Sequence, residues 1–569
     1  MAERTPQARV SFITFGSQLH FYNFRHPQVP QLCVPDVDDP FSPLPFMSMC
    51  WLEVGSEMEH IEAFLARVPT YAADAREPSS ECVVGAAVKV ATLVLSGLGG
   101  GRVIVSTHGL PSRGVGVLKP REQHKLYGTE KEKELLRPME GFWSALATDA
   151  AKQGIAFDLF VFCGEYCELV TLSALSHVTN GRVFHFSKYD PMIDSTKVQA
   201  QLLQLMTEEA GYAGILRVRA SAGLRVKRYR GHFLSQNSLD MDLASVTGSS
   251  TFFVDLEHEG NLDKKGYVYF QTALLYTTRT GHRRVRVHSF RQRTTPQYST
   301  MFESMDLEAI VFGLAQSAIG EAVNKGPQHA RQRLTEQLIK MLTTYRRYAA
   351  AEETRGSSST LLMPTRLRLL ALYVLCLLRS DALVEGTTVR IDDRVSNIFD
   401  LITMPIHKLL IYLYPSLYAV HHLRDKPHVG TINPATNNYY LPPHEQLILE
   451  SIVKQGVYVL CDEQARLVYL WIGSRVDPDV SIFLFGVADA TTVGLAGGPG
   501  EDQFDERLRN LLYALTTRDD GVRRLVVVHE GSVAEESFFK QLKEEKADHS
   551  MGYSELLELV HKSVRNALL

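Results

Sequence analysis

The chain has 569 residues, 45% of them hydrophobic and 22% charged, with a formal net charge of −4. This length is too great for one hydrophobic core, so we expect three or four domains, and the composition excludes a disordered protein. The longest apolar run, 369–378, has half of the ~20 residues that span a bilayer, and we interpret it as a buried helix. The N-terminus lacks an apolar signal-peptide core, and the seven cysteines are scattered as in a cytosolic protein with reduced thiols.

Residues 1–210 alternate strand patterns with helix patterns. Apolar runs at 10–15, 102–105 and 155–162 predict strands, and the periodicity over 83–95 predicts a helix. This alternation indicates a mostly parallel sheet covered on both faces. The glycines at the end of the helix precede a strand, so we interpret them as a C-cap and not as a phosphate-binding loop.

Residues 211–300 form a β-rich module that is strongly basic. Runs 215–219 and 283–287 alternate arginine with aliphatic residues, the pattern of strands with one buried and one wet face. An apolar run at 267–276 leads into the second of them through a hairpin-like turn at 279–282. The module has 14 Lys and Arg against 6 Asp and Glu, a net of +8, so the remainder of the chain sums to −12. We expect such a basic face to bind an acidic partner: anionic lipid, nucleic acid or an acidic peptide.

From residue 303 the apolar residues recur at helical spacing. A Gly-Ser linker at 356–360 separates the first helices from a core helix at 366–379, and a further helix is predicted over 405–414. We therefore expect an all-helical domain.

The segment 426–442 is rich in Pro, Asn and Gly, which predicts an interdomain linker. Strands at 456–460, 466–472 and 524–529 then predict a final α/β unit, which ends in a helix over 554–564.

Signals for catalysis, metal binding and nucleic-acid binding are absent or weak. Cys163 and Cys167 have no second Cys/His pair at zinc spacing, so we interpret them as core thiols. There is no G-x-S-x-G elbow, H-E-x-x-H motif, Walker loop or nucleic-acid-reading module. We therefore expect neither an enzyme nor a metal site, and no nucleic-acid partner.

The β module resembles the β-sandwich of the cargo-adaptor subunit of the COPII inner coat, the Sec-twenty-four family. The resemblance continues in order through four domains. Its strings are L-R-V-R-A-S-A-G-L-R at 216–225, G-H-F at 231–233, Q-x-A-L-L-Y-T at 271–277, R-R-V-R-V-H at 283–288, and others at 10–15, 20–23, 108–111, 118–119, 127–132, 410–417, 456–460 and 470–473.

The resemblance implies a multidomain α+β fold without enzymatic activity. The expected domains are a von Willebrand-A-like α/β trunk at 1–210, a β-sandwich at 211–300, an all-α helical domain at 301–425 and a gelsolin-like α/β domain at 426–569. The implied function is to select cargo for vesicles that travel from the endoplasmic reticulum to the Golgi. Two strings in the sandwich are closer to the animal-type class of the family than to its fungal founder.

The family also implies partners and site residues. Arg217 and Arg219 match an R-x-R pair that meets acidic export signals, and Leu274 matches an apolar neighbour on the adjacent strand; the alternative is that both arginines only form a solvated strand face. Implied partners are the GTPase-activating inner-coat subunit, the coat-initiating small GTPase, and the tails of cargo and SNARE proteins. The protein would lie on the cytosolic face of the endoplasmic reticulum and on COPII vesicles, with an anionic membrane meeting six basic residues: Arg225, Lys227, Arg228, Arg283, Arg284 and Arg286.

The chain departs from the family in two ways. It has no C-x-x-C, whereas family members carry a zinc ribbon ahead of the trunk, so no cofactor is expected within this chain, and zinc is expected only if an upstream segment exists. Only nine residues precede Val10, where the trunk's first strand and helix should lie. We expect an N-terminally truncated trunk. Either 10–15 pairs directly with 102–105, or an upstream segment supplies the central strand, and we favour the second.

Three other classes compete with the adaptor. The GTPase-activating sibling subunit has a similar fold and would supply a catalytic arginine from its gelsolin-like domain. A metal-dependent adhesion module needs an Asp-x-Ser-x-Ser string, and none is present. A gelsolin-like actin binder is disfavoured because only one such repeat is visible.

Overall fold

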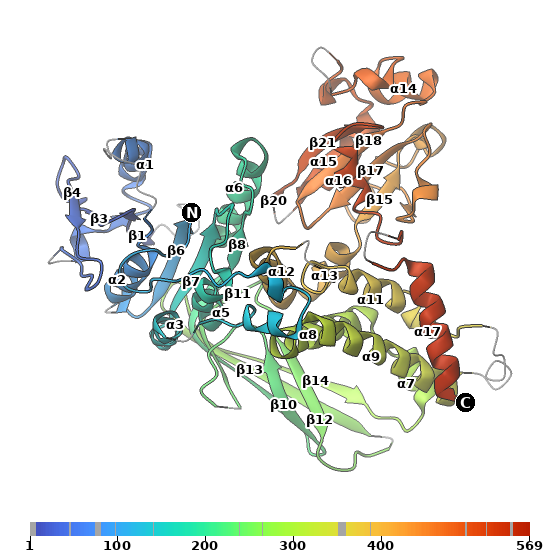
Figure 1. Ribbon diagram of the computed structural model, residues 1–569, viewed down its shortest axis with the longest axis horizontal. Helices are drawn as coiled ribbons and strands as arrows, with labels where there is room; N and C mark the ends of the chain where they lie inside the picture. Colours follow the sequence, from blue (N-terminus) through green and yellow to red (C-terminus); the bar gives the residue numbers. More distant parts are fainter. Residues whose placement is uncertain are drawn as a thin grey trace.

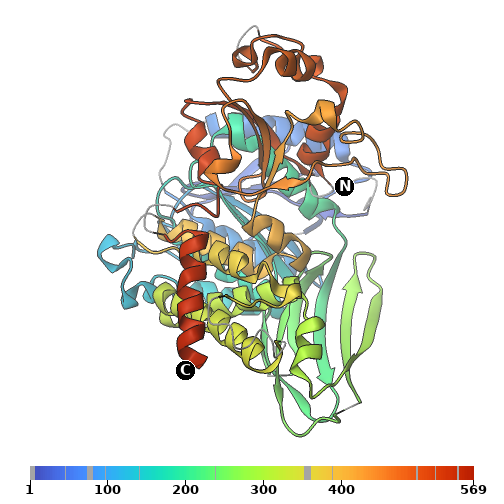
Figure 2. The ribbon, with the colours of Figure 1, turned by 90° about the vertical axis from the view of Figure 1, so that its right-hand side faces the viewer.

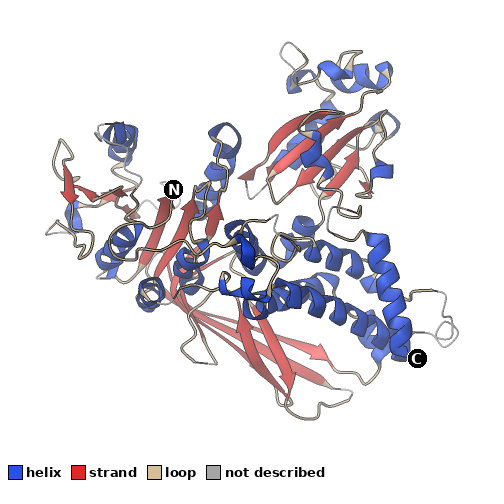
Figure 3. Cartoon of the chain, viewed as in Figure 1, coloured by secondary structure: helices blue, strands red, loops and turns tan. Residues whose placement is uncertain are grey.

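A layer of helices runs through the middle of the molecule, with a β-sandwich on one side and a C-terminal sheet on the other (Figures 1 and 3). The predicted Gly-Ser linker falls, apart from Thr360, outside the residues that the structure describes. In this computed structural model the described residues are 7–44, 47–73, 81–96, 98–139, 141–237, 239–264, 266–350, 360–386, 389–494, 498–518, 521–546 and 550–568.

The second half of the trunk contains the predicted parallel sheet. Strands β6 (Gly101–Thr107), β7 (Ile155–Val161) and β8 (Val183–His185) pair in parallel with β7 in the middle. Every residue of β7 is buried, which explains its nearly continuous apolar sequence. Helices pack around this sheet; they are α2 (Val84–Ser96), α3 (Phe142–Lys152), α4 (Leu169–Leu172), α5 (Ala174–Thr179) and α6 (Pro191–Thr207).

The first half of the trunk is antiparallel, which the sequence did not predict. Strands β2 (Ile13–Phe15), β3 (Leu19–Tyr22) and β4 (Gln31–Val34) form a separate sheet at the far end of the molecule (Figure 1). The single strand expected at 10–15 is divided, because β1 (Arg9–Val10) pairs instead with β5 (Leu52–Glu53), beside α1 (Met58–Ala73).

The two trunk sheets do not join. Among the described residues β2 pairs only with β3, and β6 pairs only with β7. Helix α2 packs against both, with Ala86 and Val90 in the core of the antiparallel half and Val84 and Val88 in the larger core. Direct pairing of 10–15 with 102–105, one of the two expected outcomes, is therefore not observed.

The basic module folds as two antiparallel sheets. The larger has the order β11 (Met241–Thr247), β9 (Ala210–Ala220), β13 (Tyr267–Thr278) and β14 (Arg283–Arg293). The predicted hairpin joins β13 to β14, and its turn uses Gly281 in the left-handed region with φ +81°. The smaller sheet pairs β10 (Leu224–Arg230) with β12 (Phe253–His258), and both sheets lie at the bottom of Figure 1.

Beyond the helices that the sequence predicted for this layer, the described residues add α7 (Tyr298–Glu303), α12 (Ile391–Thr403) and the helix that was predicted at 554–564 for the C-terminal unit. Helix α17, the last of the chain, buries Leu556, Val560 and Val564 in the same core as α9 and α11, so it belongs to this layer and not to the C-terminal unit. Figure 2 shows it lying against these helices. The members are α7 (Tyr298–Glu303), α8 (Leu307–Lys325), α9 (Pro327–Tyr348), α11 (Leu370–Leu378), α12 (Ile391–Thr403), α13 (Ile406–Leu413) and α17 (Tyr553–Leu568).

The C-terminal domain begins earlier than predicted. Strand β15 (Ser416–Ala419) pairs with β17 inside its five-stranded sheet, so the boundary lies near Pro415 and the segment 426–442 lies within the domain rather than between domains. The sheet order is β16 (His444–Glu445), β15, β17 (Val457–Asp462), β18 (Leu467–Ile472) and β21 (Arg524–His529), with α14 (Pro478–Phe485), α15 (Glu506–Thr516), α16 (Glu535–Phe539), β19 (Thr517–Arg518) and β20 (Gly521–Val522) around it.

Buried polar contacts fix the trunk to the helical layer. Arg394 of α12 is 1% exposed; it forms an ion pair with Glu132 of the trunk at 3.1 Å and donates to the carbonyls of Asp381, Ala382 and Val384.

No helix within the described ranges combines the length and the apolarity needed to cross a membrane.

Candidate functional site

The register of β9 and β13 decides which predicted site residues share a face. Arg217 lies opposite Ala273 and Arg219 opposite Gln271, whereas Leu274 lies opposite Leu216. Side chains that are directly opposite in a ladder project to the same face, and successive residues alternate. Arg217 and Arg219 therefore share one face, and Leu274 projects from the other.

Leu274 packs into the sandwich core with Leu216, Met241 and Leu243. The strand adjacency expected from the family is present, but the apolar contact beside the arginines is not supplied by Leu274. The register places three exposed aliphatic side chains on the arginine face: Ile215, Val285 and Val287, which are 39%, 65% and 52% exposed.

The two arginines differ in their surroundings. Arg217 forms a two-pronged ion pair with Asp240, through Nε and Nη2. Hydrogen bonding from Arg217 holds the pKa of the Asp240 carboxyl below its ordinary value, so this carboxylate stays charged next to the guanidinium. Arg219 is exposed and makes no ion pair within the described part of the chain. Arg219 is thus available to an anion, whereas Arg217 must share its charge.

The basic residues of β10 are largely neutralised within the protein. Arg225 and Lys227 form ion pairs with Glu257, and Arg228 pairs with Asp255 at 3.1 Å. All three basic side chains remain more than half exposed. Such exposed pairs are weak, so an anionic surface can still attract these residues, but less strongly than their number suggests.

Strand β14 does not have the buried face that its alternating sequence predicted. All eleven of its residues are exposed, because it is the edge of its sheet and the smaller sheet packs over β9. Arg283 lies on the face of Arg217, and its guanidinium donates to the Ala213 carbonyl. Arg284 and Arg286 project from the opposite face and have no ion pair among the described residues. The six residues predicted to meet a membrane therefore do not form one surface.

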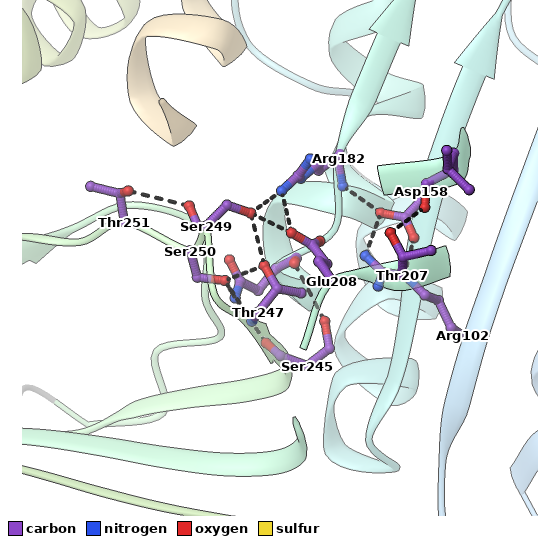
Figure 4. Close-up of polar contacts among 12 residues, drawn as sticks. Arg102, Asp158, Arg182, Thr207, Glu208, Ser245, Thr247, Ser249, Ser250 and Thr251 are labelled. Carbon is purple, nitrogen blue, oxygen red and sulfur yellow. Dashed lines mark hydrogen bonds and ion pairs between the residues drawn. The ribbon is translucent and has the colours of Figure 1, made fainter. Parts of the chain in front are cut away.

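A polar network at the junction of three domains was not predicted (Figure 4). Asp158, fully buried in β7, accepts from both the guanidinium of Arg102 and the backbone N–H of Arg182. The Arg182 guanidinium in turn donates to Glu208 at 2.9 Å and contacts Ser249 of the sandwich. The only signal in the sequence was a charged residue inside an otherwise apolar strand.

Three family models match the chain in the order of these domains. They are the Sec23/Sec24 trunk domain over residues 1–206, the Sec23/Sec24 beta-sandwich domain over 211–295 and the Sec23/Sec24 helical domain over 306–411. The fold thus contains the trunk, beta-sandwich and helical domains of Sec23/Sec24 proteins. The chain belongs to the Sec23/Sec24 family, and the relatives described next are Sec24 proteins.

The chain is 28% identical over 566 residues to protein transport protein Sec24A of Mus musculus, with 98% of this chain and 51% of the relative covered. It is 29% identical to SEC24 A of Arabidopsis thaliana and to SEC24 of Chaetomium globosum, with 98% of this chain and 54% and 60% of those relatives covered. The crystal structure of the human COPII-coat protein Sec24c matches with a TM-score of 0.85 and 26% identity over 99% of this chain and 72% of that chain.

The chain spans about half to three fifths of the length of these curated relatives. Animal, plant and fungal relatives are similar to the same degree, so membership of the animal-type class stays a prediction.

Proposed function

We propose that this chain acts as a cargo-selecting adaptor of the COPII coat and does not catalyse a reaction. The observation that carries the proposal is its homology to Sec24 proteins over 98–99% of its length, across four domains. The relatives' names refer to protein transport, and the solved structure is of a COPII-coat protein.

The arginine face, which carries Arg217 and Arg219, is the part of the molecule that we expect to bind export signals on cargo proteins. Arg219 offers a guanidinium that has no ion pair among the described residues, and a guanidinium can hold a carboxylate through two parallel hydrogen bonds. Ile215 and Val287 lie on the same face and are exposed, so they can contact an aliphatic residue next to the acidic one. An extended acidic peptide with one or two leucines fits this combination.

We also propose partners and a cellular location for this chain. We expect the trunk to pair with the GTPase-activating inner-coat subunit, and the assembly to form with the coat's small GTPase on the cytosolic face of the endoplasmic reticulum. Arg284 and Arg286 are the basic residues best placed to meet anionic lipid, since no acid neutralises them within the described ranges. We propose no cofactor for this chain.

The test is reconstitution on liposomes with the GTPase-activating subunit, the small GTPase and a membrane-anchored acidic export signal. The adaptor is expected to sediment with the liposomes more strongly when both partners are present than when it is alone, and to enrich the signal. It should add no GTP hydrolysis of its own. Hydrolysis by the small GTPase with this chain alone would instead identify the sibling function.

A further inference from the structure

A small pocket opens beside the polar network where the trunk, the sandwich and the helical layer meet. Its volume is about 20 Å³, enough for one or two water-sized atoms. None of its lining residues is acidic. They are Arg102, Asn180, Gly181, Arg182, His232, Thr247, Ser249, Ser250, Thr251 and Thr403.

Two donors in this lining, one on Arg102 and one on His232, have no acceptor among the described residues. Arg102 donates hydrogen bonds from Nε and Nη2 to the Asp158 carboxylate. Its buried Nη1 has no partner within the described part of the chain. His232 is 1% exposed, and neither ring nitrogen makes a hydrogen bond among the described residues, although the Gly181 carbonyl lies near the ring. A buried polar group without a partner is costly, so such groups commonly mark a missing ligand or water.

The acids of the network lie behind the arginines rather than in the pocket. Asp158 and Glu208 fix the two guanidinium groups in place, and neither lines the pocket. Burial is the main reason that the pKa of His232 lies well below its ordinary value, so the ring is neutral and can donate one N–H. Asp158 and Glu208 therefore hold part of each guanidinium, and the unpaired donors that the described lining residues offer are Arg102 Nη1 and one N–H of His232.

We propose that this junction pocket binds a small oxyanion of carboxylate size, held by Arg102, Arg182 and His232. A carboxylate oxygen fits the volume and accepts from guanidinium and imidazole N–H groups alike. The ligand would touch the trunk through both arginines and the sandwich through His232, so its binding should tighten their contact. It comes either from a free small carboxylic acid or from the carboxylate of a protein chain.

The test is thermal unfolding of the full chain with sodium formate or acetate, against sodium chloride at the same ionic strength. Saturating formate should raise the midpoint by about 2–4 °C more than chloride does. Arg182→Gln and His232→Phe each remove one donor, and each should weaken formate binding at least tenfold. His232→Phe retains the ring that packs 4.9 Å from Phe399, so it remains informative if the arginine variant does not fold.

Thr403→Val is the matched control, because the Thr403 hydroxyl already donates to the Phe399 carbonyl at 2.8 Å and has no proton for a ligand. It should retain the full formate effect. Triglycine as a free acid and as an amide separates the two sources: a shift with the free acid alone identifies a chain carboxylate, and a shift with formate but neither peptide identifies a small acid. Equal shifts with formate and chloride, or an unchanged shift in a folded Arg182→Gln or His232→Phe variant, would overturn the proposal.

Discussion

Arg217 and Asp240 form a two-pronged ion pair at the edge of the face that we propose reads cargo. The pair makes one of the two arginines of the family's R-x-R string a shared charge, whereas Arg219 has no such partner among the described residues. An acidic signal must therefore either use Arg219 or compete with Asp240 for Arg217. This relationship gives the first prediction.

Replacing Asp240 with Asn should tighten binding of an acidic peptide by about 3–10-fold, or ~1 kcal/mol, because Arg217 loses its internal counter-ion. Fluorescence anisotropy with a labelled L-x-x-L-E-type peptide measures the change. Asp242→Asn is the matched control, since it alters the net charge equally without touching the ion pair. Equal effects of the two variants would mean that only the overall charge matters.

Membrane binding should depend on β14 more than on β10. Arg284→Ala with Arg286→Ala removes two charges that have no ion pair within the described ranges, each worth roughly 1 kcal/mol near an anionic surface. Lys227→Ala with Arg228→Ala removes two charges that acids already neutralise in part. Flotation with phosphatidylserine liposomes at low and moderate salt should therefore fall further for the β14 pair. Salt-independent binding of the wild type would instead indicate apolar insertion.

The buried ion pair between Arg394 and Glu132 should hold the trunk to the helical layer. Arg394→Met leaves Glu132, which is 3% exposed, without its counter-ion, and removal of one partner of a buried pair costs about 3–5 kcal/mol. Calorimetry should show a clear drop in the unfolding temperature. Arg333→Met, which breaks an exposed pair with Glu336, should change it little. Similar small shifts for both variants would show that the buried pair contributes nothing.

Asp400 should make stability depend on pH. Burial is the main cause that raises the pKa of its carboxyl to about 6 in the folded protein, and Tyr412 lies 3.4 Å from its Oδ2. Because the folded pKa exceeds the unfolded one, the group favours folding fully below about pH 4. This contribution is lost as the pH rises through 6, by about 1–3 kcal/mol.

Asp400→Asn should accordingly flatten the plot of unfolding temperature against pH between 4 and 6.5, and raise the value at pH 7. Chemical denaturation at each pH gives the same comparison in free energy. Identical pH profiles for the variant and the wild type would show that this carboxyl does not titrate in that range.

The fold was predictable wherever apolar periodicity decides the structure. Runs such as 524–529 became strands with the expected bounds, and the hairpin around Gly281 formed as its residues indicate. Long-range placement was not predictable. The pattern of 554–564 indicates a helix with one apolar face. Such a face can pack on any apolar surface, so only the fold shows that this helix packs on α9 and α11.

The same limit applies to the site. The alternation in 283–287 predicts a strand with two distinct faces, but no local pattern shows that its sheet ends there and leaves both faces exposed. The adjacency of Leu274 to the arginine strand was correct, whereas its face depended on a register that single sequences do not encode. The pocket at the domain junction is lined by residues from three domains, and no local pattern brings them together. The one available signal was Asp158 of the adjacent network, a charged residue inside an apolar strand.

Equilibrium binding of an acidic, leucine-containing export-signal peptide to the wild type and to Arg217→Ala with Arg219→Ala tests the cargo-adaptor account most directly. Losing two charged hydrogen-bond donors should weaken binding at least tenfold, since each such contact contributes about 1.5–3 kcal/mol. The unfolding temperature should stay nearly unchanged, because both side chains lie on the outer face of the sheet. Unchanged peptide binding, with or without a large drop in unfolding temperature, would contradict the account.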